Sequence, residues 1–350
     1  MEGCYARLQQ FMPLNEIEEV FYELYCSPEQ KLDQYYDRKL STPELTMNFR
    51  NFCCWLESCE DNLLPESTFF APEQNVAINF HIRYMPQWLH RHDFIEVQYV
   101  LQGNLHQTIG GHTVSLSAGD VCFISPNAAH DPRIYDHDSL MVNLLLRLDT
   151  FHRAFSNSLA TEDIISEFFM RVLYGKGNQP YLLCRTGNDQ RLFSLLLDMI
   201  DVQDAPDLYT DRLLRTMVEQ FFIYLLRDHK DDFAAAAFRK KSDENILSIL
   251  RYIQRNYSTV TLSSVAKHFN YNEAYLSRII HSYMGIPFSQ ALIELRMQQA
   301  ATLLRSSDQP ITEVMGLVGY TDKTHFYRSF RNKFGMTPAQ YREQGNTQAS

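Results

Sequence analysis

The last third of the chain repeats a single unit, and this repeat constrains the fold more than any other feature of the sequence. Residues 261–290 and 310–340 align with Val265 opposite Val314 and Tyr271 opposite Tyr320. After a one-residue shift, five further positions of the first unit match the second: Leu276, Arg278, Ile280, Gly285 and Gln290 with Phe326, Arg328, Phe330, Gly335 and Gln340. A duplication of this length predicts two copies of one supersecondary motif.

Each unit has the pattern of a helix, a tight turn and a second helix. In the first unit, Asn272 is placed to cap the second helix. In the second unit, Gly319 supplies the turn, and Thr321 or Asp322 caps the helix that follows. Residues 288–307 between the units form one helical pattern, roughly 30 Å long. Because one turn of DNA is about 34 Å, the two second helices can enter successive major grooves.

Charge divides the chain near the same boundary. The formal net charge is −10, yet residues 239–350 hold 14 Lys and Arg against 8 Asp and Glu. The preceding 238 residues hold 18 basic and 34 acidic side chains. A basic C-terminal third on an acidic protein predicts a polyanionic partner for that third alone.

Residues 243–344 resemble the DNA-binding domain of the AraC-type bacterial transcription regulators. The resemblance is carried by R-x-x-x-A-x-x-L-L from Arg296 to Leu304, V-G-Y at 318–320, F-x-R-x-F at 326–330 and G-x-T-P-x-x-Y-R at 335–342. Met315-Gly316 departs from the small and polar residues usual in the family, and His325 stands where a hydroxyl residue or tyrosine is common. The resemblance implies binding to promoter DNA, and it allows RNA polymerase as a further partner.

Position by position, the resemblance implies a set of base-edge contacts from both units: Ala274, Ser277, Arg278, Lys323, Thr324, Tyr327 and Arg328. Arg331 and Lys333 are expected on phosphates. Ala274 and Ser277 have little hydrogen-bonding reach, so we expect Arg278 to read most of what the first unit recognises. The plain alternative is an all-helical interaction domain with a solvated basic face, and the tandem arrangement argues against it.

From about residue 75 to 148 the apolar pattern changes from the helical period to a period of two. Short β-rich runs such as 94–103 and 112–120 are separated by turn signals, among them Gly103-Asn104 and Gly110-Gly111. Several short strands with regular turns predict an antiparallel barrel or sandwich. The patterns at residues 10–65 and 188–228 are helical. The predicted fold class is therefore α+β, an antiparallel β-barrel with flanking helices followed by an all-α domain of two helix-turn-helix units.

The stretch HRHDFIE at 90–96 places His90, His92 and Glu96 on one face of a strand. On a straight strand Glu96 lies roughly 13 Å beyond His92, so one ion reaches both only if the strand curls. The segment resembles the motifs of the cupin barrel, which are met by His90, His92, Glu96 and Gly103 and then by Gly119, Pro126 and His130. The proline is displaced by one position, and Asn127 replaces the usual glycine. In cupin enzymes such residues bind a divalent metal, whereas AraC-type sensor barrels often keep the pattern without metal.

Three interpretations are open for the four residues His90, His92, Glu96 and His130. They line a pocket for an organic ligand, which we favour, or they are structural or vestigial, or they hold a metal. Aromatic residues nearby suit stacking on a sugar ring but equally suit a packed core: Trp88, Phe94 and Tyr84. Three further histidines show no ligand spacing and are expected at the surface: His106, His112 and His137.

These patterns favour a ligand-responsive DNA-binding regulator over a cupin metalloenzyme, such as an isomerase or dioxygenase, with an accessory helical domain. Neither a glycine-rich phosphate loop nor a G-x-S-x-G elbow occurs, so we expect no enzymatic activity and no cofactor. The sequence has no run of about 18 apolar residues and no secretion signal, so we expect no membrane contact. Seven cysteines without a Cys-x-x-Cys indicate reduced thiols in the cytoplasm.

The predicted order is a helical N-terminal extension at 1–70, a cupin-like sensor barrel at 71–150, a helical dimerisation region at 151–230, a linker at 231–242 and the tandem helix-turn-helix domain at 243–344. A broad apolar stripe from Leu213 to Leu226 predicts a contact that makes the protein a homodimer. A small-molecule effector, a sugar by the habit of the family, is expected in the barrel.

Overall fold

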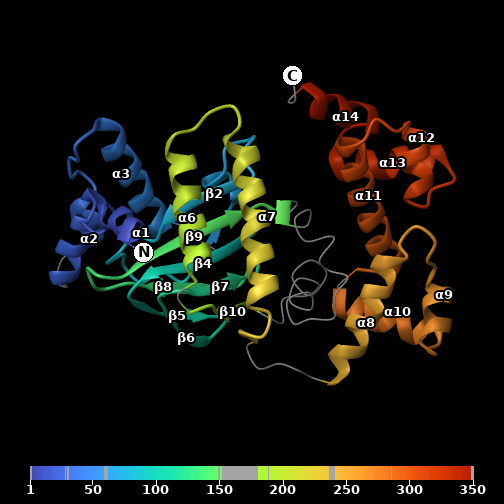
Figure 1. The fold of residues 1–350 in the computed structure, drawn as a ribbon, viewed down its shortest axis with the longest axis horizontal. Helices are drawn as coiled ribbons and strands as arrows, with labels where there is room; N and C mark the ends of the chain where they lie inside the picture. The colour runs from blue at the N-terminus through green and yellow to red at the C-terminus, as the bar shows by residue number, and fades with distance from the viewer. Residues whose placement is uncertain are drawn as a thin grey trace. The chain divides into compact units, whose positions relative to one another are not determined.

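The computed structural model describes residues 2–27, 29, 31–58, 62–148, 150–151, 180–187, 189–235, 241–284 and 286–347. The chain divides into two compact units (Figure 1), one containing residues 1–155 and 177–237 and the other containing residues 238–350. We call them the N-terminal unit and the C-terminal unit. No helix in the described ranges is both long and apolar enough to cross a membrane.

The N-terminal unit begins with three α-helices and a short 3-10 helix: α1 (Glu2–Gln9), α2 (Glu16–Cys26), η1 (Leu32–Tyr35) and α3 (Pro43–Ser58). Helix α2 starts with a capping box, in which Asn15 accepts from the backbone N–H of Glu18 and Glu18 accepts from that of Asn15. The helices share a small apolar core, and Phe21 and Phe49 meet edge to face within it. Tyr84 from the following β region joins this core.

Two antiparallel sheets follow. The six-stranded sheet has the order β11-β10-β7-β4-β9-β2, and the three-stranded sheet has the order β6-β5-β8. The strands are β2 (Val76–Phe80), β4 (Ile95–Gln102), β5 (Asn104–Ile109), β6 (His112–Ser117), β7 (Asp120–Ile124), β8 (His130–Arg133), β9 (Leu140–Leu146), β10 (Tyr181–Arg185) and β11 (Phe233–Ala235). A short parallel pair, β1 (Leu63–Leu64) and β3 (Arg91–His92), and the 3-10 helix η2 (Glu66–Thr68) complete this region.

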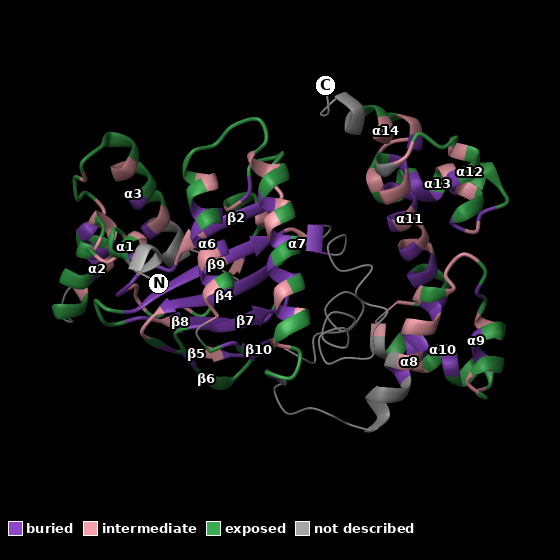
Figure 2. Cartoon of the chain, in the orientation of Figure 1, coloured by how far each residue is buried: buried purple, intermediate pink, exposed green. Residues whose placement is uncertain are grey.

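Alternation along the strands separates two apolar layers. One face of the large sheet meets the small sheet in a common core that includes Val100, Leu105, Cys122 and Leu183. The other face is covered by α6 (Gln190–Asp204) and α7 (Thr210–Asp228), which lie across the strands in Figure 1. Figure 2 shows the strands buried beneath these helices, whose outer surfaces are exposed. The α+β fold class, a cupin-like region followed by a helical unit, is confirmed.

The strands differ from the sequence prediction in two places. β10 and β11 lie within the regions predicted as helical (151–230) and linker (231–242), yet they pair with each other and extend the large sheet. β10 is five residues long and β11 is three, too short for periodicity to separate strand from helix. β8 was also not predicted, because His130-Asp-Pro-Arg133 has no β-rich composition and its pairing with β5 alone makes it a strand. Residues 152–179 and 236–240 of those two regions lie outside the described part of the chain.

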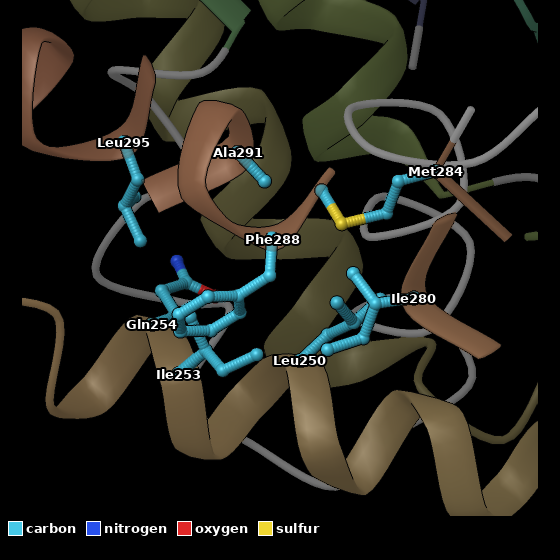
Figure 3. Close-up of a pocket in the computed structure, with 8 residues that line it drawn as sticks. All are labelled: Leu250, Ile253, Gln254, Ile280, Met284, Phe288, Ala291 and Leu295. Atoms are coloured by element: carbon cyan, nitrogen blue, oxygen red, sulfur yellow. The ribbon is translucent and has the colours of Figure 1, made fainter. Parts of the chain in front are cut away.

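In the residues that the structure describes, the C-terminal unit contains helices and no strand: α8 (Lys241–Arg255), α9 (Leu262–His268), α10 (Glu273–Met284), α11 (Phe288–Ser306), α12 (Ile311–Leu317), α13 (Lys323–Phe334) and α14 (Pro338–Thr347). The uninterrupted helix predicted at 288–307 is confirmed as α11. One face of α11, with Met297 and Leu304, packs against α12 and α13, where Phe330 of α13 belongs to the same core. Its N-terminal half closes the first helix-turn-helix unit, where eight side chains surround a cavity of about 20 Å³ (Figure 3). A cavity of that size holds about one water molecule.

Candidate functional site

Glu96 lies at the centre of a buried cluster of histidines inside the barrel. Its Oε2 atom is 2.8 Å from Nε2 of His92 and 3.1 Å from Nε2 of His130. The backbone N–H groups of His90 and His130 each donate to the carbonyl oxygen of the other residue. The centroids of their two rings lie 4.2 Å apart. Ligand atoms of His90, Glu96 and His130 all fall within 4.8 Å of one another. The structure thus brings together the four residues that the sequence singled out.

The strand departs from straight geometry as a shared site requires, because the chain bends between His92 and Glu96. β3 ends at His92, residues 93–94 form a bend, and β4 begins at Ile95. Nδ1 of His92 contacts the carbonyl oxygen of Phe94 at 2.9 Å, which holds the bend closed. The two side chains that a flat strand would separate by roughly 13 Å therefore touch.

All three imidazoles of the cluster are oriented by backbone carbonyls. Nδ1 of His90 faces the oxygen of Trp88 at 3.2 Å, and Nδ1 of His130 faces that of Ala128 at 3.0 Å. A carbonyl oxygen only accepts, so each Nδ1 carries the proton and each neutral ring presents an Nε2 lone pair to the interior. This is the orientation that a carbonyl behind a metal-ligating histidine imposes.

Burial and charge act in opposite directions on the cluster. Burial lowers the pKa of His90 well below its ordinary value and also lowers the pKa of His92. Burial would lower the pKa of His130 too, but the hydrogen bond to Glu96 raises it overall. Burial would raise the pKa of Glu96, yet the contacts with His130 and His92 hold that pKa well below its ordinary value. The favoured state is a carboxylate beside one protonated imidazole.

That state leaves the contact between His92 and Glu96 without a proton. With Nδ1 of His92 donating to the Phe94 carbonyl, a neutral His92 turns an acceptor toward an acceptor only 2.8 Å away. A second proton or a cation between these atoms removes the conflict. The donor set, imidazole nitrogens with one carboxylate, suits a divalent metal such as zinc, iron or nickel.

The neighbouring aromatic rings stack on histidines. Trp88 lies against His90 with ring centroids 4.4 Å apart, and Phe94 lies against His92 at 4.1 Å. Phe94 is fully buried and meets Phe70 edge to face. Phe94 therefore packs the cluster from behind, while the half-buried Trp88 retains some exposed surface. The buried Tyr84 contacts the N-terminal helices, and His106, His112 and His137 are exposed, as predicted.

The sequence interpretation missed three polar residues of the barrel interior. Gln98 donates through Nε2 to Oε1 of Glu96, at 3.2 Å, and Gln107 donates to Oε1 of Gln98, at 2.6 Å. Burial lowers the pKa of His81 to about 4, and Glu96 and His130 are among the charges that act on it. The alternation from Glu96 to Gln98 along one strand face was a readable signal for the first of these. Gln107 lies in β5 and His81 directly follows β2, and the sequence does not specify what either residue faces.

In the C-terminal unit, the two turns form as the sequence predicts. Asn272 accepts from the backbone N–H of Tyr275 at the start of α10, and Asp322 accepts from that of His325 at the start of α13. Gly319 adopts a left-handed φ of 81°. Gly285, which matches Gly335 in the repeat, lies outside the described residues. Both second helices therefore begin at capped, defined positions.

The side chains predicted to contact DNA lie on the outer surface of these two helices. Seven of them are exposed: Ala274, Arg278, Lys323, Thr324, Arg328, Arg331 and Lys333. Ser277 and Tyr327 are half-buried. Arg328 additionally lines a surface hollow of about 460 Å³ between α11 and α13, opposite Gln290 and Glu294. No pattern in the sequence indicates this hollow, since it depends on how α11 crosses α13.

The two helix-turn-helix units are fixed to each other at one point. Arg296 of α11 donates to the carbonyl oxygens of Tyr257 at 2.8 Å and Ser258 at 3.1 Å. Gly319 lies directly against the same segment, so a Cβ atom there would stand 1.9 Å from the oxygen of Ser258. The guanidinium of Arg296 also lies over the ring of Tyr320. The segment that leads into the first unit is thus held between the central helix and the turn of the second.

Comparison with known proteins connects both units to one class. Residues 265–344 match the helix-turn-helix domain family, and residues 80–145 match the cupin domain family. The activator RhaS of Citrobacter koseri is 26% identical over 259 residues, 73% of this chain and 87% of RhaS. The raffinose operon regulatory protein RafR of Pediococcus pentosaceus is 25% identical over 254 residues, 72% of this chain and 85% of RafR.

The C-terminal domain of AraT, a response regulator from Geobacillus stearothermophilus, is 38% identical, with 29% of this chain and 84% of that domain covered and a TM-score of 0.28. The chain belongs to the AraC-type transcription regulators. As an AraC-type regulator, it joins a cupin-like ligand-binding domain to a DNA-binding domain of two helix-turn-helix units. RhaS and RafR are both named as transcription regulators.

Proposed function

We propose that this regulator reads promoter DNA with both helix-turn-helix units and that a small molecule in the barrel controls this binding. The observation that carries the proposal is the fixed pair of capped helices α10 and α13, joined by α11 and held together by Arg296. Nineteen residues of α11 span about 28 Å, close to the pitch of DNA. Arg278 and Arg328 would read guanine edges, and Arg331 and Lys333 would contact phosphates.

Selection of bound fragments from a genomic DNA library by the purified full chain tests the DNA-binding part. We expect one recurrent sequence in a promoter region, bound with a steep dependence on salt. Binding that is equal on all fragments would contradict specific recognition. RNA polymerase is the partner that a promoter-bound activator would contact, and the bacterial cytoplasm is where such a protein would act.

We further propose that the effector is a sugar bound beside the Glu96 cluster. The printed name of RafR connects that relative to a raffinose operon. Ligand would shift the protein between two states that present the DNA-binding units differently, which requires a different affinity of the ligand for each state. A rise in the melting temperature of the full chain with one class of compound would identify the effector, since only what binds the folded state shifts the melt.

A metal at the cluster is a second candidate, favoured by the unprotonated contact between His92 and Glu96. His90, Glu96 and His130 would hold it, with His92 beside them. There the ion would be the sensed species or a bridge to the organic ligand. A fall in melting temperature on chelation, reversed by one metal, supports this site, and an unchanged melt speaks against it.

We also propose a homodimer through α7. Its buried stripe, with Val218 and Phe222, packs on the sheet, while Leu213 and Ile223 are exposed on the opposite side. An apolar patch on an exposed helix marks an interaction surface. Ile223→Glu is expected to convert the dimer to a monomer in analytical ultracentrifugation, and Leu89→Glu, at another exposed leucine, is the control. A wild-type chain that sediments as a monomer at all concentrations would exclude the dimer.

A further inference from the structure

Three tyrosine side chains are exposed together where helix α2 meets the loop between β8 and β9. Tyr22 and Tyr25 of α2 are 37% and 51% exposed, and Tyr135 of the loop is 38% exposed. The rings of Tyr25 and Tyr135 stack, with centroids 5.2 Å apart and an angle of 17° between their planes. We call the surface formed by these three residues the tyrosine face.

A fourth tyrosine, Tyr84, lies buried beneath this face and supports it. The centroid of its ring is 4.8 Å from that of Tyr22 and 5.4 Å from that of Tyr25. Its backbone has a φ of 60°, a left-handed conformation that bulky residues rarely adopt. The backbone N–H of Tyr84 donates to the carbonyl oxygen of Ile134, the neighbour of Tyr135, at 2.8 Å. Strain of this kind is concentrated at functional sites, and here it holds the four rings together.

The charged side chains around the tyrosine face are acidic. Helix α2 contains four glutamates and no basic residue, and Glu19 lies one turn from Tyr22 on the same side of the helix. Asp136 and Asp138 are exposed in the loop between β8 and β9. Burial and the charge of Asp136 raise the pKa of Tyr84 to about 12, which indicates that this carboxylate lies close to the rings.

The arginines of the neighbouring segments do not neutralise these carboxylates. Three of them are paired with other acidic residues: Arg38 with Glu23, Arg83 with Glu18 and Arg133 with Asp131. Within the described part of the chain, no salt bridge involves Glu19, Asp136 or Asp138. The tyrosine face therefore presents aromatic rings and free carboxylates to the solvent.

This combination favours a cationic partner, and arginine over lysine. A guanidinium group is planar, stacks on an aromatic ring and can pair with a carboxylate through two N–H groups, whereas an ammonium group is a compact, strongly hydrated charge. The same unit contains an example of this arrangement. The guanidinium groups of Arg191 and Arg227 lie over the ring of Tyr224, and each also pairs with Asp228 at 2.9 Å.

We propose that the tyrosine face is a docking surface for a partner protein that presents an arginine-rich segment. Tyr25 and Tyr135 supply the rings on which guanidinium groups stack, and Glu19 and Asp136 supply the carboxylates. The surface includes none of the side chains assigned to DNA or to the cluster around Glu96. The inference therefore goes beyond the proposed function and does not depend on it.

The test measures the binding of two synthetic peptides to the full chain by isothermal titration calorimetry. Each peptide alternates glycine with a basic residue, which is arginine in one and lysine in the other. Because the two peptides carry the same charge, their general attraction to an acidic protein is equal. We expect the arginine peptide to bind about tenfold more tightly, since two or more stacked guanidinium groups contribute. Equal affinity for the two peptides overturns the proposal.

Two double variants then assign the contact to the rings. Tyr25→Ala combined with Tyr135→Ala should abolish the preference for arginine. Tyr25→Phe combined with Tyr135→Phe keeps both rings and should retain it. Tyr209→Ala is the control, because Tyr209 is an exposed tyrosine that directly precedes α7 and lies outside the tyrosine face. A preference for arginine that persists in the double alanine variant shows that the peptide binds elsewhere and refutes the assignment.

Glu19→Gln provides a test that does not disturb the packed rings. It removes one exposed carboxylate and should weaken the arginine peptide several-fold, and unchanged affinity would contradict the role of the acidic side chains. Folding of every variant is checked by urea unfolding followed by tryptophan fluorescence, since Trp55 and Trp88, the chain's two tryptophans, both belong to the N-terminal unit. Sedimentation of the full chain tests the other occupant. Self-association that the double alanine variant abolishes would make the tyrosine face a contact between two copies and would overturn the proposed partner.

Discussion

Arg83 provides the most demanding quantitative test of the N-terminal unit. Its guanidinium is 1% exposed and donates to Glu18 of α2, at 3.0 and 2.8 Å. It also donates to the carbonyl oxygens of Met12, Pro13 and His137, at 2.8, 2.9 and 3.0 Å. One side chain thus holds the N-terminal helices and a barrel loop together.

Arg83→Met keeps the alkyl stem but leaves Glu18, 3% exposed, without its counter-charge. A buried charge that loses its partner costs about 3–5 kcal/mol. For a unit of this size, each kcal/mol lowers the melting temperature by about 2–4 °C, so a loss of roughly 6–20 °C is expected. Adding Glu18→Gln removes the uncompensated charge, so the double variant should regain about 2 kcal/mol.

Urea unfolding of the full chain, followed by tryptophan fluorescence, measures this loss in the N-terminal unit alone. Arg38→Met is the matched control, because Arg38 pairs with Glu23 of the same helix but the two side chains are 40% and 47% exposed. An exposed pair is worth at most about 1 kcal/mol. If Arg83→Met cost no more than Arg38→Met, Glu18 would be solvated and the N-terminal helices would not dock as described.

Three further predictions concern other parts of the chain. Gly319→Ala should destabilise the C-terminal unit by more than about 2 kcal/mol in urea unfolding followed by circular dichroism. Gly316→Ala is the control and should be neutral or stabilising, because Gly316 lies in α12 with open space beside it. Equal effects of the two variants would contradict the close contact at Gly319. Burial holds the pKa of His81 at about 4, so the folded protein protonates this ring at a lower pH than the unfolded chain does. The free energy of unfolding is therefore highest above about pH 6.5 and falls as the pH drops toward 4. His81→Gln should make that fall shallower in unfolding at stepped pH, and parallel profiles would contradict it. Arg328→Ala should cost about 1–3 kcal/mol and relax specificity at one base, whereas Arg331→Ala should weaken all sequences alike; uniform weakening by Arg328→Ala in competition binding would make Arg328 a phosphate contact.

The helical C-terminal unit was largely predictable because its information is local. Helical periodicity, the capping residues Asn272 and Asp322 and the turn glycine Gly319 each act within a few positions of the chain. The repeat supported these assignments, because the same pattern of helix, turn and helix occurs in both copies. The clamp by Arg296 on residues 257–258 was not predictable, since it joins positions almost forty residues apart.

The barrel was predictable in class but not in detail. Alternation identified β2, β4 to β7 and β9, yet β8, β10 and β11 are strands because of their partners and not because of their composition. The candidate site was likewise predictable in its residues but not in its geometry. The spacing of His90, His92 and Glu96 identified the cluster, but the bend that joins His92 to Glu96 is a tertiary feature. The contact between Arg83 and Glu18 spans 65 residues and left no local signal.

The most direct test of the account is methylation interference on the promoter fragment that the full chain binds best. If both helix-turn-helix units read DNA, methyl groups on guanine N7 block binding in two successive major grooves, about 10 base pairs apart on one face of the DNA. Arg328→Ala should remove the interference in one groove and leave the other. Interference in a single groove, or none in either, would contradict recognition by two fixed helix-turn-helix units.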